Sequence, residues 1–399
     1  MLTNMYRKHK CAIQPSKVKL IWIFIMALPF SWASIAVGSI YRIVTLILFT
    51  LYLINSKLLV HISTNKRKIL IIWVLYIGYS IITMFWSTNF SAAVTNSMSL
   101  VLLSLIVLVF FATDLYDEDE TNIDKCWILS GIICAVIYIF GDRTSIGEYG
   151  SRTSMTILGT PTDPNEFASI FIVPISLALY ELLHKRGSRL LQALFIIGAL
   201  YCVFMTGSRG ALLAVVVAML VTAVQNVKIS VKAIIITAVI GFLSIAVFMR
   251  YIFPLIPDDV LTRLSIKAIL EDGGSGRGDV WIDAFRKIWS GSVLRMIFGY
   301  GQYGLTVGTQ GVTQTMHNQF IQQLSNYGFI GLILYCMLIY RTYAVIRKKC
   351  KRYVGAFWGM MVMSLTITMS GAYKPLWILM LMPVIMASNT EEHTINYGK

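Results

Sequence analysis

The chain has 399 residues, of which 57% are hydrophobic and only 13% are charged. Soluble domains carry about 25% charged residues, and a soluble fold of this length could not cover so much apolar side chain with polar surface. The same composition excludes an intrinsically disordered chain. The composition therefore predicts a polytopic helical membrane protein.

Apolar stretches recur along the whole chain. A helix that crosses a bilayer needs about 20 mostly apolar residues. Twelve stretches approach this length: 20–40, 43–56, 69–86, 98–113, 126–141, 166–183, 190–206, 210–225, 232–252, 325–343, 353–370 and 375–389. We expect an all-α protein with about 12 transmembrane helices, forming a single integral membrane domain over residues 1–399.

The distribution of basic residues indicates the orientation. Twelve spans place both termini on the same side, and the loops of that side, 341–352 among them, hold most of the Lys and Arg residues. Short loops rich in Lys and Arg stay in the cytoplasm. Both termini are therefore expected in the cytoplasm, and the net charge of +15 reports orientation and does not indicate nucleic acid as a partner.

Three connections stand out from the short ones. Residues 114–125 are acidic and are expected as a cytoplasmic loop, whereas residues 142–165 form an outer loop rich in Gly, Ser and Thr. Residues 253–324 form a long extracytoplasmic loop, and loops of this length are usually functional. We therefore expect the functional groups on the outer side of the membrane.

One segment of the long loop has a helical pattern. Apolar side chains recur at intervals of three and four residues from Val280 to Trp289, while Arg286 and Lys287 fall on the other face. This pattern predicts an amphipathic helix at the outer membrane interface, with Trp281 and Trp289 as its anchors.

Two polar clusters on the outer side adjoin predicted spans. In Thr162–Glu166, Asp163 and Asn165 either cap a helix or are polar groups of a site held at its rigid start. In Thr206–Gly210, a tight turn carries Arg209, which either reaches toward lipid headgroups or binds an anion such as phosphate.

A third cluster, Gly273–Asp279, precedes the amphipathic helix and contains Arg277. Its glycines fit either a flexible hinge or a close approach to an anion at a helix N-terminus. The spacing of a P-loop is absent. With Arg209, this residue suggests an anion-binding site on the outer face.

The fourth cluster begins at His317, which is followed by Asn318. The chain has five histidines, and His317 is the one expected on the outer face. It is either structural or a base, since histidine transfers protons near neutral pH. No His-carboxylate metal spacing occurs in the sequence, so we expect no metal and no cofactor. Arginines and a histidine suit a lipid phosphate or diphosphate as substrate.

The motifs in this order resemble the superfamily of O-antigen ligases and Wzy-type polysaccharide polymerases. The resemblance covers roughly residues 150–345. It lies in T-D-P-N-E-F-A (162–168), T-G-S-R-G-A (206–211), S-G-R-G-D-V-W (275–281), F-G-Y-G-Q-Y-G (298–304) and H-N-Q-F-I-Q-Q-L-S-N-Y-G-F-I-G-L (317–332).

The resemblance implies a metal-independent glycosyltransferase with a GT-C-like fold in the bacterial cytoplasmic (inner) membrane. Its donor would be a glycan on undecaprenyl diphosphate. Arg209 and Arg277 would hold the diphosphate, His317 would be the base, and Asp163 and Asn165 would orient the acceptor or His317. Asn318 is included among the substrate-binding residues.

The acceptor distinguishes two activities within the superfamily. A polymerase extends a lipid-linked glycan, making O-antigen or capsule, whereas a ligase transfers glycan to lipid A-core. We expect a polymerase, because polymerases of this superfamily are commonly more divergent and the chain matches only the short motifs. The expected partners, besides membrane lipids, are a chain-length regulator and a flippase. A flippase or transporter is the alternative from another class, but it predicts internal symmetry and charged spans, which the sequence lacks.

Overall fold

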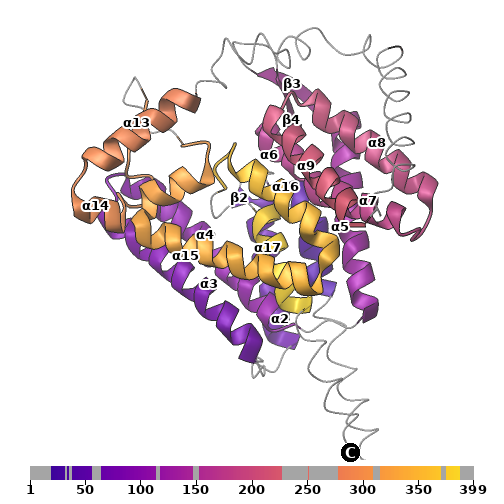
Figure 1. Ribbon diagram of the computed structural model, residues 1–399, viewed down its shortest axis with the longest axis horizontal. Coiled ribbons are helices and arrows are strands. Elements are labelled where there is room, and N and C mark those ends of the chain that lie inside the picture. The colour runs from indigo at the N-terminus through magenta and orange to yellow at the C-terminus, as the bar shows by residue number, and fades with distance from the viewer. Residues whose placement is uncertain are drawn as a thin grey trace, which may run out of the picture. The chain divides into compact units, whose positions relative to one another are not determined.

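The computed structural model describes most of the chain (Figure 1). It covers residues 19–31, 34–35, 38–55, 64–113, 117–146, 152–226, 250, 277–308, 315–369 and 374–386. Its contacts divide the chain into two compact units, and the boundary falls within helix α5 (Asp117–Phe140). Unit 1 comprises Met1–Ser130, Arg277–Lys351 and Ser364–Lys399, and unit 2 comprises Gly131–Gly276 and Arg352–Met363.

Unit 1 is built around α15 (Gln319–Lys349), which packs along α3 (Thr64–Ile82) and against α14 (Val293–Phe298) and α17 (Lys374–Met386) (Figure 1). A buried aromatic cluster joins three of these helices, with Trp73 and Trp377 in edge contact at 5.7 Å between ring centroids. The other elements of unit 1 are a helix over 19–26, η1 (Leu28–Phe30), β1 (Ser34–Ile35), β2 (Gly38–Ser39), α2 (Ile40–Asn55), η2 (Thr83–Trp86), α4 (Phe90–Phe111) and α13 (Arg277–Ser290).

Unit 2 combines a small antiparallel sheet with a helical layer. In the sheet, β4 (Arg152–Ile157) pairs with β3 (Asp142–Ile146) on one side and β5 (Thr160–Pro161) on the other. In the helical layer, α7 packs on α8 and α9. The bounds are α6 (Pro164–Ser169), α7 (Ile172–Leu183), α8 (Arg189–Met205), α9 (Arg209–Asn226) and α16 (Val354–Ser364), preceded by η5 (Lys351–Tyr353).

Close packing in unit 2 depends on glycines of α16. A side chain at Gly359 would collide with Ile172 of α7 and with the backbone of Ala214 in α9. A hydroxyl pair between Ser176 and Thr222, 2.9 Å apart, satisfies two polar groups within the same apolar contact. Small residues and paired hydroxyls are how helices approach one another in a membrane.

Among the described residues, six helices are long and apolar enough to cross a membrane. They are Lys66–Trp86, Phe90–Phe111, Glu120–Phe140, Pro164–Leu183, Arg209–Asn226 and Gln319–Lys349, and shorter apolar helices cover Ile40–Ile54, Arg189–Met205 and Pro375–Met386. The predicted class, an all-α membrane protein, is confirmed. The total of twelve spans stays a prediction, and the stretch 232–249 lies outside the described residues.

Two predicted spans are shorter in the structure. The helix predicted over 20–40 ends at residue 26, just before Pro29, which lacks the N–H that would continue it. The span predicted over 353–370 ends at Ser364, because polar groups of α15 bind the following backbone: the Gln319 side chain accepts from the N–H of Met369 at 2.6 Å.

Two predicted loops contain regular structure. The outer loop predicted over 142–165 forms the three-stranded sheet of unit 2, in which Asp142 pairs with Thr156 and Ile146 with Arg152. The cytoplasmic loop predicted over 114–125 is helical from Asp117 onward.

Candidate functional site

The predicted site residues fall into two groups, one in each unit. Unit 2 contains Asp163, Asn165 and Arg209, and unit 1 contains Arg277, His317 and Asn318.

In unit 2, Asp163 is the N-cap of α6. Its Oδ1 accepts hydrogen bonds from the backbone N–H groups of Asn165 at 2.8 Å and Glu166 at 3.1 Å. Pro164 follows at the first helical position, where a missing N–H costs nothing. The structure therefore gives Asp163 the capping role, while its exposed position leaves the carboxylate accessible to solvent.

The turn before α9 holds the second cluster of unit 2. Gly207 has a φ of 66°, a left-handed conformation that glycine adopts without strain. The Ser208 hydroxyl accepts from the N–H of Ala211 at 3.3 Å, which caps α9, and donates to Oδ1 of Asn165 at 2.8 Å. Both Ser208 and Asn165 are buried. The structure thus joins two sequence clusters more than forty residues apart.

Arg209 is the first residue of α9 and is half-buried. A helix N-terminus has a positive partial charge, so a cation there costs about 0.3–1 kcal/mol. An arginine in this position adds its charge to that of the helix end and raises the positive potential. This arrangement is suited to an anion.

In unit 1, His317 has an unusual backbone conformation. Its φ is 46°, in the left-handed region that costs a residue with a side chain roughly 1–2 kcal/mol. The ring nitrogen Nε2 lies 3.4 Å from the hydroxyl of Thr315, and the side chain is half-buried. A conformation of this kind persists only where its surroundings hold it.

Neighbouring residues hold this segment on both sides. The N–H of Met316 donates to Oε1 of Gln322 at 3.0 Å, and its carbonyl accepts from Nε1 of Trp281 at 2.7 Å. Asn318 caps α15, accepting from the N–H groups of Phe320 and Ile321 and donating to the carbonyl of Leu365. Asn318 is nearly buried, so its amide serves the backbone.

Arg277 is the first residue of α13, one helical turn before Trp281. Residues four positions apart lie on the same helix face. The hydrogen bond from Trp281 to Met316 therefore ties the helix that begins with Arg277 to the segment that carries His317. Like Arg209, Arg277 adds a positive charge to a helix N-terminus.

The predicted amphipathic helix is confirmed as α13, but half of its apolar stripe packs on protein. Ala284 and Ile288 are buried in a cluster with Leu305, Met316 and Leu324. Trp281 is partly buried against this cluster, and its indole N–H is bonded to Met316, so its role as an anchor at the membrane interface stays a prediction. Trp289 is 56% exposed and keeps an outward position.

On the other face of α13, a salt bridge and two hydrogen bonds hold the helix against Thr306 and Gly308. The Lys287 ammonium lies 2.9 Å from Asp283 and donates to the carbonyl of Thr306 at 2.8 Å. Asp283 also accepts from the N–H of Gly308 at 3.0 Å. The hydrogen bond from Lys287, followed by that from Gly308, lowers the pKa of the Asp283 carboxyl below its ordinary value.

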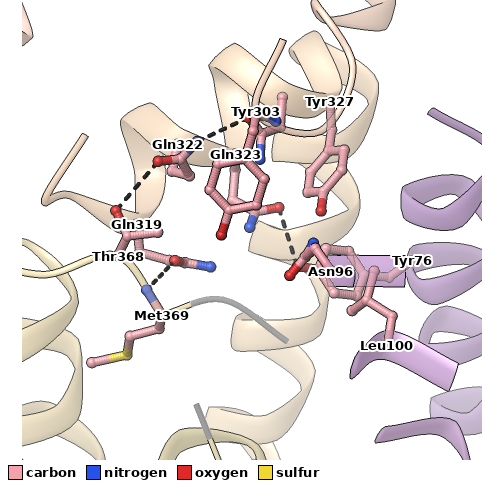
Figure 2. Close-up of a pocket in the computed structure, with 11 residues that line it drawn as sticks. Tyr76, Asn96, Leu100, Tyr303, Gln319, Gln322, Gln323, Tyr327, Thr368 and Met369 are labelled. Carbon is pink, nitrogen blue, oxygen red and sulfur yellow. Dashed lines mark hydrogen bonds between the residues drawn. The ribbon is translucent and has the colours of Figure 1, made fainter. Parts of the chain in front are cut away.

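The start of α15 lines a small polar cavity within unit 1 (Figure 2). Gln319, Gln322, Gln323 and Asn326 lie on one helix face, at the spacing i, i+3, i+4 and i+7. Tyr76 donates to Gln323 at 3.2 Å across the cavity, and the amide nitrogen of Gln322 donates to Asn326 at 2.8 Å. The remaining lining residues are Asn96, Leu100, Tyr303, Tyr327, Thr368 and Met369.

The F-G-Y-G-Q-Y-G segment inserts beside a break in α15. At Gly328 the helix is interrupted, with a φ of 62°. The N–H of Tyr300 donates to the freed carbonyl of Ser325 at 2.9 Å, and the N–H of Gly301 to that of Asn326 at 3.0 Å. A broken helix is tolerated in a membrane protein where neighbouring groups satisfy its backbone.

The side chain of Gln302 secures the inserted segment. It is fully buried and donates from Nε2 to the carbonyl of Ser80 at 2.5 Å and the hydroxyl of Ser97 at 2.9 Å. Its Oε1 accepts from Asn96 at 2.8 Å. Sequence reasoning missed this residue and the glutamines of α15. The spacing of Gln and Asn residues after His317 predicts that the glutamines share one face of a helix.

Within the described part of the chain, no group of three or more His, Cys, Asp or Glu side chains is placed to hold a metal ion. The chemically distinctive groups are instead the two arginines at helix starts, the histidine and the buried amides. The described helices define a helical membrane protein.

Residues 193–336 match the family model described as O-antigen ligase. The match confirms the resemblance to the superfamily of O-antigen ligases and polysaccharide polymerases that the motifs indicated. It includes Arg209, Arg277 and His317, whereas Asp163 and Asn165 precede it.

No curated protein matches the chain. A chain from a solved structure, described as "Structural coordination of polymerization and crosslinking by a peptidoglycan synthase complex", is similar over 83% of this chain and 98% of its own length. The identity is 13% and the TM-score 0.46, too low to bear on fold or function.

Proposed function

We propose that the protein is a metal-independent polysaccharide polymerase. It transfers a glycan from undecaprenyl diphosphate onto a lipid-linked glycan acceptor at the outer face of the bacterial cytoplasmic membrane. The observation that carries the proposal is the hydrogen bond from Trp281 to Met316, which ties the helix headed by Arg277 to the segment of His317. The superfamily match supports glycosyl transfer as the reaction class.

The chemistry assigns one role to each kind of group. The acceptor hydroxyl oxygen forms a bond to the anomeric carbon as the bond from that carbon to the diphosphate oxygen breaks. His317 takes the hydroxyl proton, and the departing diphosphate keeps the electron pair. Arg277 and Arg209 bind the diphosphate and stabilise its growing negative charge. Asp163 and Asn165 orient the acceptor, and Asn318 supports the base as the cap of its helix.

A second candidate is an O-antigen ligase that uses lipid A-core as acceptor. The matched family is described as O-antigen ligase, and the groups that would bind the donor are the same in both candidates. Vesicles supplied with lipid-linked glycan alone, or with lipid A-core in addition, distinguish the two. Product that forms only with lipid A-core would overturn the polymerase assignment.

Replacement of the base tests the proposal most directly. In vesicles, His317→Ala should lower polymer formation by about 10²- to 10⁴-fold, while donor binding and the amount of protein stay unchanged. His184→Ala, which removes a ring stacked on Tyr180, is the control and should retain activity. An active His317→Ala variant would contradict the role of base, and loss of donor binding would make His317 a phosphate ligand.

The diphosphate ligands are tested by a substitution that keeps the charge. Arg277→Lys should lower activity by about tenfold or more, because lysine cannot reproduce the two-pronged grip of arginine on phosphate oxygens. Arg286→Lys, on the exposed face of the same helix, is the matched control. Equal activity of the two variants would reduce Arg277 to a source of general positive potential. Chelators should have no effect.

The orientation is part of the proposal. Both termini and residues 341–352 are placed in the cytoplasm, because basic residues gather there. Reporter fusions after Arg352 and within 277–308 should give opposite signals. The same signal from both would separate the proposed site from the outer face.

A further inference from the structure

We propose that Trp281 and Gln322 are positioning residues that hold His317 in its working conformation. The inference rests on the proposed function, in which His317 is the base. It goes further by assigning the control of that base to two side chains that need not touch either substrate.

Met316, the residue before His317, is buried. Each of its two peptide groups is bonded to a side chain from another part of unit 1: its N–H to Gln322 and its carbonyl to Trp281. Since backbone groups usually bond to other backbone groups, this double engagement by side chains is uncommon. It fixes the peptide plane on each side of Met316.

The next residue needs such support. His317 has a left-handed φ of 46°, which an unrestrained histidine would leave for a more favourable region. The peptide before it is held through Met316, and the residue after it is held as the cap of α15. With both flanking positions fixed, the direction of the His317 Cα–Cβ bond is fixed as well.

The amide of Gln322 is itself oriented. Its Nε2 donates to Oδ1 of Asn326 at 2.8 Å, and that same oxygen accepts from the N–H of Tyr303 at 3.1 Å. An amide flip would bring the Gln322 oxygen against an acceptor and its NH₂ group against the N–H of Met316. The hydrogen bonds of the residues that line the polar cavity (Figure 2) therefore keep the Gln322 oxygen directed at the N–H of Met316.

Trp281 adds a second constraint. It lies one turn after Arg277, so the same hydrogen bond sets the position of the helix that carries the proposed diphosphate ligand. A shift of α13 would pull on the backbone next to His317. Catalysis is sensitive to such shifts, since a misplacement of about 1 Å can cost roughly 10²-fold in rate.

Two substitutions test the inference with minimal change of shape. Trp281→Phe removes the indole N–H but keeps an aromatic ring, and Gln322→Met removes the acceptor oxygen at similar volume. Each should lower kcat by about 10- to 100-fold and change the KM for the lipid-linked donor by less than about twofold. Thr95→Val, on the exposed face of α4, is the control and should keep its kcat.

A double-mutant cycle separates positioning from a general loss of structure. If Gln322 acts through His317, Gln322→Met should lower the residual rate of His317→Ala no further. Independent, multiplicative losses in the two backgrounds would overturn the inference. A fully active His317→Ala variant would instead show that the proposed function had failed, and the positioning role with it.

A measurement without turnover covers variants with little activity. Peptide-resolved carbethoxylation of the membrane-embedded protein should modify His317 several-fold faster in Trp281→Phe and Gln322→Met than in wild type. The rate at His184 should stay unchanged. Equal rates at His317 in all proteins would mean that the two residues do not hold it.

Discussion

The two groups of site residues are positioned in different ways. In unit 2, Asp163 and Ser208 each cap a helix within a few residues of themselves, and one hydrogen bond, from Ser208 to Asn165, joins the two helix starts. In unit 1, the segment of His317 depends on contacts with residues distant in sequence, such as Trp281 and Leu365. Substitutions in unit 2 should therefore act locally, whereas substitutions in unit 1 should act over a distance.

The largest effect is expected where the inserted segment meets the break in α15. Gly299 has a φ of 82°, and a Cβ there would collide with the backbone of Asn326 and Gly328. Gly299→Ala should lower the stability of unit 1 by about 3 kcal/mol or more, since both conformation and space exclude the methyl group. Thermal unfolding in detergent measures the change.

Gly198→Ala is the matched control. Nothing lies within 4 Å of a Cβ at this position in α8, and alanine is the better helix former. This variant should unfold at the wild-type temperature or above it. Equal behaviour of Gly198→Ala and Gly299→Ala would remove the argument that the broken helix and the inserted segment support unit 1.

The next effect is expected at Gln302. Gln302→Leu should cost about 2–3 kcal/mol, because it leaves the carbonyl of Ser80 and the side chains of Ser97 and Asn96 without this partner inside the protein. Thr95→Val, on the exposed face of α4, should change stability by less than about 0.5 kcal/mol. A mild Gln302→Leu variant would mean that the inserted segment is held by its backbone alone.

The contrast between the units explains what the sequence could predict. The cap at Asp163 follows from the Asp-Pro pair, and α13 follows from its apolar stripe, because both signals lie within one turn or two of helix. The glutamines of α15 share one face and could be found by their spacing. Their partners could not be found, since Tyr76 and Gln323 are brought together only by tertiary packing.

The break in α15 and the sheet of unit 2 were not predicted, because local sequence carries little signal for either. Glycine is common inside membrane helices, so nothing local marked Gly328 as the site of a break. The break depends on the insertion of residues 299–301, which supply its hydrogen bonds. The sheet over 142–161 was missed because its strands are short and polar, and register between short strands carries little sequence signal.

A smaller, local effect is expected in unit 2. Ser208→Ala removes the cap of α9 and the bond to Asn165, and it should cost about 1–2 kcal/mol. Ser188→Ala removes the exposed cap of α8, which has no such link, and should cost about 1 kcal/mol or less. The difference between the two variants, measured by thermal unfolding, isolates the bond to Asn165. Equal costs would mean that this bond does not couple the two clusters.

The smallest effect concerns the salt bridge of α13. Because hydrogen bonds from Lys287 and Gly308 lower the pKa of Asp283, its contribution to stability is present above the unfolded carboxyl pKa of about 3.9. That contribution is lost as the pH falls through the lower pKa of the folded protein. Amide exchange at Gly308 should therefore accelerate in acid, beyond the change in intrinsic exchange rate. In Asp283→Asn the additional acceleration should disappear, because no carboxylate remains to titrate. If both proteins respond to acid alike, another group holds residues 305–308 against α13. Contacts between residues distant in sequence would then not stabilise this face of α13.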